Sequence, residues 1–152
     1  MIDRERILEL IPHQGGMCLW DAVDEWDAGS IVLSAGTHRD PDNPLRSAGR
    51  LRGVHLCEYG AQAMAVHGGL RAAALAGNSG NSAPIQARPG VLVALRNVHL
   101  HVARIDDLPG RLQCRAEILV ESDDSQQYSF SIHYAGSVLA EGRAAVVLGS
   151  AP

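Results

Sequence analysis

One segment of this chain sets strong limits on the fold. Residues 53–76 contain no proline and many glycine and alanine residues, and they would be apolar on almost every side of a helix. A helix with such a surface is stable only when it is buried on most sides, and its small side chains allow a sheet to approach closely. The sequence therefore predicts one long central helix that other elements enclose.

Most of the remaining chain is predicted to form strands. The strand patterns cover residues 17–27, 31–35, 91–102, 111–122, 127–134 and 138–148. Within 111–122, Ala116, Ile118 and Val120 alternate with residues of the opposite face and are expected to face the core. Turn residues separate the later strands, as in antiparallel hairpins.

Short elements and loops complete the predicted order. A helix over 3–11, which Asp3 caps, begins the chain and ends before Pro12. Loops are expected over 38–52 and 77–90. This order predicts an α+β protein with an antiparallel sheet of about six strands wrapped round one long helix. One helix covers only part of such a sheet, so we expect a dimer that joins two sheets edge to edge.

Composition excludes several functions. The 152 residues are enough for one domain, predicted to cover 1–152. All 13 basic residues are arginine, which excludes Schiff-base, pyridoxal-phosphate and Walker-type phosphate sites because these need a lysine amine. A net charge of −4 and 4% aromatic residues argue against a nucleic-acid partner. The three cysteines form no Cys-x-x-Cys pair, and no apolar run approaches the ~18 residues of a membrane span, so a cytoplasmic protein is expected.

The predicted central helix carries one carboxylate, Glu58. His55 and Gln62 lie at i−3 and i+4 from it, so a hydrogen-bonded line of three side chains is possible. Free N–H groups at the nearby helix start favour an anion or a developing oxyanion. Two interpretations stay open: a reactive carboxyl group, or a buried carboxylate that His55 and Gln62 merely satisfy.

Three sequence motifs resemble those of the 3-hydroxyacyl-ACP dehydratases of fatty-acid synthesis. Ile11-Pro12-His13 opens a stretch that reaches Asp21, the segment 53–62 is similar to their Gly-Val-x-x-x-Glu-x-x-Ala-Gln helix, and 108–112 resembles their Pro-Gly turn. The segments 43–46, 49–51 and 58–69 are more similar to the ApeP-like dehydratases of aryl polyene pigment clusters. The resemblance implies a hotdog fold and an activity that needs no cofactor.

The resemblance also implies roles for particular residues. In that family a histidine of one subunit and the helix glutamate of the other remove water from a 3-hydroxyacyl thioester, and an N–H at the helix start polarises the thioester carbonyl. By this resemblance Glu58 matches the family's helix glutamate, and the N–H of Gly53 matches the one that polarises the carbonyl. Gln62 matches the glutamine of the helix motif. Pro44 stands at the position of the family's histidine, fourteen residues before Glu58.

The absent histidine leaves three explanations. Either His38 or His55 replaces it, or a partner hotdog dehydratase supplies it, or the chain is a catalytically silent subunit; we prefer the last two. A thioesterase of the same fold, in which the helix carboxylate attacks or activates water, is a further alternative. Homodimer and heterodimer both remain open.

Basic residues gather in the loop before the central helix. Arg46, Arg50 and Arg52, together with Arg39, could dock the phosphopantetheine phosphate of an acidic acyl carrier protein. Each arginine taken singly is more simply explained by local salt bridges. His99, His101 and His133 lie on strand patterns without a converging acid, so no metal site is predicted.

Overall fold

The computed structural model describes residues 1–78 and 90–149. The first helix and strands form the N-terminal part, in the order β1 (Ile2–Asp3), α1 (Arg4–Leu10), β2 (Ala22–Trp26) and β3 (Ser30–Ala35). Three short 3-10 turns cover Gly15–Met17, Thr37–Arg39 and Gly53–His55. The long helix α2 (Leu56–Asn78) follows, and then β4 (Gly90–Leu100), β5 (Leu112–Glu121), β6 (Ser125–Tyr134) and β7 (Ser137–Leu148).

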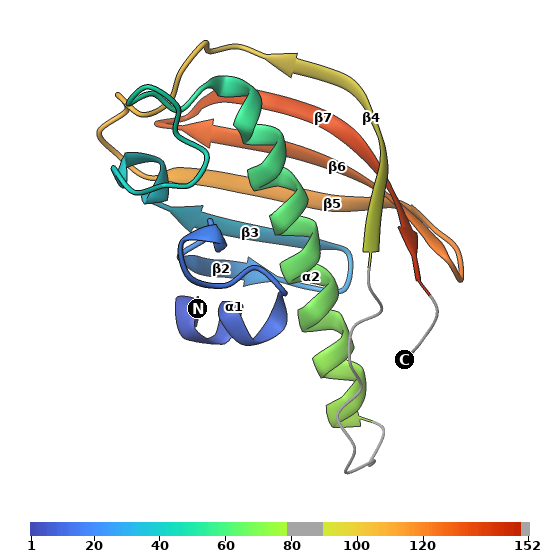
Figure 1. Ribbon diagram of the computed structural model, residues 1–152. Helices are drawn as coiled ribbons and strands as arrows, with labels where there is room; N and C mark the ends of the chain where they lie inside the picture. The colour runs from blue at the N-terminus through green and yellow to red at the C-terminus, as the bar shows by residue number, and fades with distance from the viewer. Residues whose placement is uncertain (79–89, 150–152) are drawn as a thin grey trace.

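The strands form one antiparallel sheet in the order β1-β2-β3-β5-β6-β7-β4. The sheet curves round α2, which crosses its concave face (Figure 1). This arrangement confirms the predicted hotdog architecture. The seventh strand is β1, a two-residue strand that the pattern analysis did not separate from the first helix.

The capping of α1 follows the prediction closely. The Asp3 side chain accepts a hydrogen bond from the N–H of Arg6, and the helix ends at Leu10, before Pro12. The predicted strand over 17–27 is shorter than expected, because Gly15–Met17 forms a 3-10 turn and the strand begins at Ala22. Apart from its two ends, the loop predicted over 77–90 lies outside the described residues.

Small residues of α2 allow the close packing that the sequence predicted. A Cβ atom added at Gly60 would lie 2.8 Å from the Phe130 ring of β6, and one added at Gly69 would lie 2.9 Å from Leu10 of α1. Tyr59 and Val66 of α2 are fully buried. The helix therefore forms the centre of the core.

The alternation predicted for β5 holds over only part of the strand. Leu112, Cys114 and Ala116 are fully buried, but Val120 is 58% exposed and does not face the core as expected. The register with β6 shifts between Ile118 and Val120, and a β-bulge of this kind turns the following side chains to the other face.

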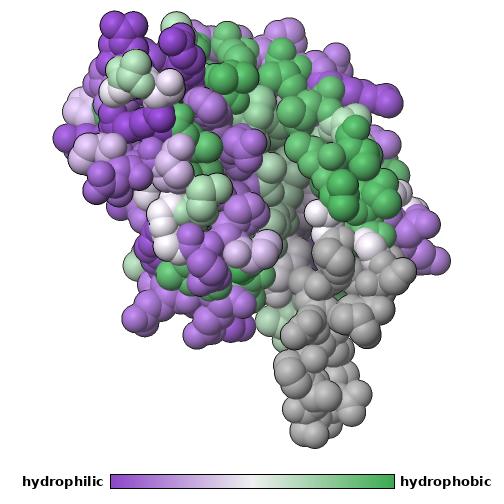
Figure 2. Space-filling model, in the orientation of Figure 1, coloured by the Kyte–Doolittle hydropathy of each residue, from purple (hydrophilic) through white to green (hydrophobic). Residues whose placement is uncertain are grey.

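One edge of the sheet is long and apolar. Strand β4 pairs only with β7 among the described strands. Its exposed apolar residues are Val91, Leu92, Val93, Leu95 and Leu100. Hydrophobic side chains gather over this part of the molecule in Figure 2. No helix within residues 1–78 and 90–149 combines the length and apolar character needed to cross a membrane.

Candidate functional site

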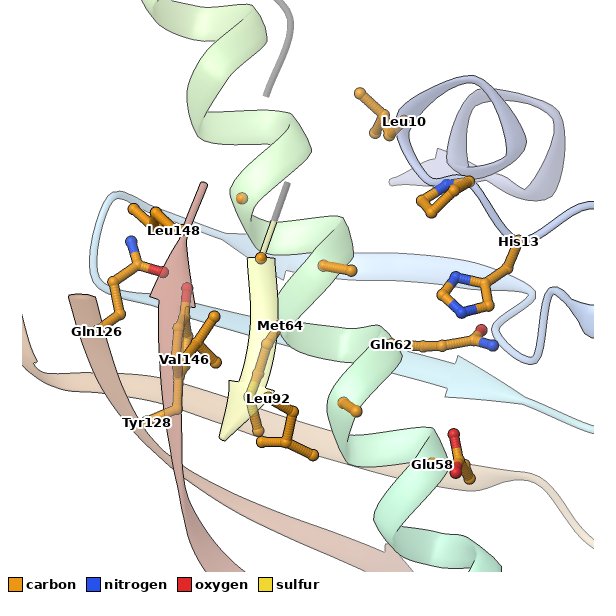
Figure 3. Close-up of a pocket in the computed structure, with 15 residues that line it drawn as sticks. Leu10, His13, Glu58, Gln62, Met64, Leu92, Gln126, Tyr128, Val146 and Leu148 are labelled. Carbon is orange, nitrogen blue, oxygen red and sulfur yellow. The ribbon is translucent and has the colours of Figure 1, made fainter. Parts of the chain in front are cut away.

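A cavity of about 410 Å³ lies along one side of α2. Six residues of α2 line it, and four of them, Glu58, Ala61, Ala65 and Gly68, are three or four residues apart and so lie on one helical face. The other described lining residues are Leu10, Pro12, His13, Gln62, Met64, Gly90, Leu92, Gln126, Tyr128, Val146 and Leu148 (Figure 3). The size and mostly apolar lining suit an extended apolar ligand.

Glu58 is the only carboxylate among the described residues that line the cavity. Its side chain is exposed in the single chain, so it lies on the open side of the cavity. Among the described residues it has no hydrogen-bond or ion-pair partner. The carboxyl group is therefore free to meet a ligand, and the alternative of a buried carboxylate satisfied by neighbouring side chains is wrong.

Gln62 does not form the hydrogen-bonded line predicted with Glu58. Its Oε1 accepts a hydrogen bond from the N–H of Leu19 at 2.9 Å, and its Nε2 donates to the carbonyl oxygen of Met17 at 2.6 Å. The buried amide therefore fastens the segment before β2 to the central helix. One N–H of the amide is left over on a residue that lines the cavity.

The N–H of Gly53, which was predicted to polarise the thioester carbonyl, is already used within the protein. The N–H of Gly53 donates to the carbonyl oxygen of Ala103 at 2.9 Å, so it is not a free oxyanion donor. A Cβ atom at this position would lie 2.1 Å from the carbonyl oxygen of Val102, which explains why glycine is needed there. The next amide, of Val54, has no backbone acceptor within the described part of the chain.

Comparisons with known proteins identify the family. The family described as ApeP-like, ApeP dehydratase, matches residues 5–150. This chain belongs to the ApeP-like dehydratases.

The solved structures share the same fold. The dehydratase heterocomplex ApeI:P from Xenorhabdus doucetiae contains a chain with 21% identity and a TM-score of 0.76, covering 99% of this chain and 93% of that one. A hypothetical thioesterase with coenzyme A from Streptococcus pneumoniae has 12% identity and a TM-score of 0.58, covering 86% of each chain. A thioesterase from Staphylococcus aureus has 16% identity and a TM-score of 0.52, with coverage of 85% and 93%. No curated protein matches the chain.

Neither histidine predicted as a substitute base lines the cavity of this ApeP-like chain. His38 is completely buried, and its Nε2 donates to the carbonyl oxygen of Leu108 at 3.0 Å. Burial lowers the pKa of His38. His55 lies in the turn before α2 and is also absent from the cavity wall. Neither side chain therefore lies beside Glu58 in this cavity, and both assignments stay predictions.

The predicted arginine cluster separates into two groups. The Arg46 guanidinium donates to the carbonyl oxygens of His38, Asp40 and Gly49, so it holds the loop together and is not available to a ligand. Arg50 and Arg52 are exposed, and their guanidinium groups have no partner within the described residues. Arg39 donates to the carbonyl oxygen of Pro109, so within the described residues only Arg50 and Arg52 have guanidinium groups without a partner.

The sequence predicts no metal site among the histidines of the strand patterns. The His99 and His101 rings stack with their centroids 6.4 Å apart on β4, and His133 bonds to the hydroxyl of Ser131. Within residues 1–78 and 90–149, no group of three His, Cys, Asp or Glu side chains is placed to hold a metal ion.

His67 of α2 is fully buried and bonds to Tyr128, one of the residues that line the cavity. Its Nε2 donates to the carbonyl oxygen of Asp27 at 2.8 Å, and its Nδ1 accepts from the Tyr128 hydroxyl at 2.7 Å. Burial lowers the pKa of His67 and raises that of Tyr128 to about 12. The charges that act on His67 are Arg71, which lowers its pKa, and Asp27 and Glu121, which raise it; Arg71 and Glu121 form an ion pair.

The lowered pKa of His67 predicts a stability that falls in acid. Below the ordinary pKa of ~6.5, the unfolded chain binds a proton that the folded histidine resists, so the free energy of unfolding should fall as the pH drops from 7 to 5. His38 acts in the same direction. Urea unfolding across this range should show a smaller slope for His67→Gln. Replacing exposed His99 with glutamine is the control, and an unchanged slope in His67→Gln would contradict the assignment.

The sequence analysis did not single out His13 as a site residue. His13 follows Pro12 after α1, and it lines the cavity that also holds Glu58. Its Nδ1 is shielded from solvent and has no hydrogen-bond partner among the described residues. The available signal was the Ile11-Pro12-His13 motif, which pointed to the family without indicating that residue 13 reaches the helix face.

Proposed function

We propose that residues 1–152 act as one hotdog domain that dehydrates 3-hydroxyacyl thioesters on an acyl carrier protein, in fatty-acid or polyene synthesis. One observation carries the proposal: a single free carboxylate, Glu58, lies in the wall of an otherwise mostly apolar cavity beside the central helix. Membership of the ApeP-like dehydratases supports the same reaction. Thioester-activated elimination needs only acid and base groups.

The proposed loss of water needs neither an oxidant nor a reductant. A base removes the proton from C2 of the acyl chain, Glu58 protonates the hydroxyl group that leaves C3, and a double bond forms between the two carbons as water departs. The cavity wall formed by Ala61, Ala65 and Gly68 provides space for the rest of the acyl chain. Over the ten residues from Glu58 to Gly68 the helix rises about 15 Å, enough for a medium-length chain.

We further propose that the chain works with a second hotdog dehydratase. A histidine supplied by such a partner is one of the two explanations that the sequence analysis preferred, and the heterocomplex of the similar chain from Xenorhabdus doucetiae supports pairing. The exposed apolar strand β4 is the surface available for joining two sheets. Arg50 and Arg52 are the proposed contacts for the acidic carrier, since their side chains are unpaired within the described residues.

A single assay separates the proposed function from its alternatives. A 3-hydroxyacyl carrier protein is incubated with this chain alone and together with a candidate partner, and the products are followed by mass spectrometry. Loss of water with the thioester intact supports dehydration. Release of the free thiol would instead indicate a thioesterase. Activity that depends on the partner and survives Glu58→Gln would indicate a catalytically silent subunit.

A further inference from the structure

The chain's own histidines differ sharply in their access to the cavity. His38 and His67 are fully buried, His67 uses both ring nitrogens in hydrogen bonds, and His55 does not line the wall. The remaining histidines outside the cavity wall are His99, His101 and His133. Since all seven histidines lie in the described ranges, His13 is the one that lines the cavity with Glu58.

His13 is also firmly positioned. The Gln14 side chain donates to the carbonyl oxygens of Leu8 and Ile11, at 2.7 and 3.1 Å, and so ties this segment to the end of α1. On the other side, Gln62 binds the backbone of residues 17 and 19. Because the backbone is held by hydrogen bonds on both sides of residue 13, the side chain loses little conformational freedom when it binds a substrate.

The geometry places His13 on the same flank as the carboxyl group. In Figure 3 the ring of His13, the amide of Gln62 and the carboxyl of Glu58 follow one another along the cavity wall. Gln62 and Glu58 are i+4 neighbours, whose Cβ atoms stand about 5–6 Å apart. An acyl chain lying along this wall would meet an imidazole and a carboxyl group at nearby carbons. The Nδ1 of the imidazole is enclosed by the protein and unpaired within the described residues, so the other ring nitrogen, Nε2, is the one open to a ligand.

We propose that His13 is the general base of this chain and replaces the histidine that the family carries at the position of Pro44. The inference rests on the proposed dehydration. The Nε2 lone pair takes the proton from C2, the electron pair of that C–H bond becomes the second bond between C2 and C3, and Glu58 protonates the departing hydroxyl. The imidazolium then returns its proton to the carboxylate through solvent, so both groups are ready for another turnover.

The test compares His13→Gln with wild type in the active complex. The substrate is 3-hydroxyoctanoyl-pantetheine, and the enoyl product is quantified by mass spectrometry. Loss of a general base predicts a fall of about 10²–10⁴-fold in kcat/KM. His133→Gln, in a histidine of β6 that does not line the cavity, is the matched control and is expected to retain wild-type turnover.

The outcomes distinguish this inference from the proposed function. Turnover by His13→Gln within threefold of wild type, with loss of activity when the partner's histidine is replaced, would overturn the inference and leave the dehydratase function standing. Absence of dehydration in every preparation would overturn both. If His13→Gln does not fold, ring signals of labelled histidine in the wild type are followed while a 3-hydroxyoctanoyl-pantetheine amide is added. A shift of the His13 signal supports the inference, and an unchanged signal overturns it.

Discussion

Replacing Glu58 with glutamine is expected to lower dehydration by the active complex at least 10²-fold. Glutamine keeps the size of the side chain but cannot deliver a proton to the leaving hydroxyl, and a general acid contributes about 10²–10⁴-fold to such a reaction. The measurement is kcat/KM for formation of the enoyl thioester. Binding of the acyl chain should change little, because the rest of the cavity wall is untouched.

The Glu58→Gln variant should fold normally. Glu58 is exposed and has no partner among the described residues, and surface substitutions of this kind change stability by only about 0.5 kcal/mol. Glu117→Gln, on the outward face of β5, is the matched control for loss of a carboxylate far from the cavity. Equal turnover by Glu58→Gln and Glu117→Gln would remove Glu58 from the mechanism.

Trp20→Ala is expected to cause the largest loss of stability, about 3–5 kcal/mol. Trp20 is completely buried, and its indole N–H donates to the carbonyl oxygen of Tyr59 at 2.8 Å. Its ring also meets that of Tyr59 edge to face, with centroids 5.3 Å apart. Removing the indole leaves a cavity beside Tyr59 of the central helix.

Trp26 provides the comparison for this measurement. It is the last residue of β2, the strand that follows Trp20, and it is only half-buried, so Trp26→Ala should cost clearly less. Urea unfolding of both variants gives the two free-energy differences. A loss in Trp20→Ala no larger than in Trp26→Ala would show that the contact with Tyr59 does not anchor the helix.

The fold could be predicted because its signals are local. The all-round apolar helix and the alternating strands appear as repeating patterns within short windows, and they identify the elements without any knowledge of their partners. The prediction failed where a local irregularity intervened. At the bulge between Ile118 and Val120, one extra residue reverses the faces of the strand, and no pattern in the sequence marks it.

The candidate site could be predicted only in part. Glu58 was identifiable as a carboxylate in an apolar helix, but the partners of Gln62, Gly53 and Arg46 depend on contacts between residues that are distant in sequence or in irregular loops. Such contacts have no periodic signature. His13 was missed for the same reason, since the approach of residue 13 to the helix face is visible only once the chain is folded.

Because Glu58 is exposed to solvent, its effect on a reaction depends on what covers it. A carboxyl group in contact with bulk water has little electrostatic influence on a reacting bond, and its influence grows when a covering surface displaces that water. If a second subunit provides that surface, specific activity becomes a function of protein concentration. Diluting the protein below the dissociation constant of the assembly would then abolish the specific activity, while each separate chain stayed folded.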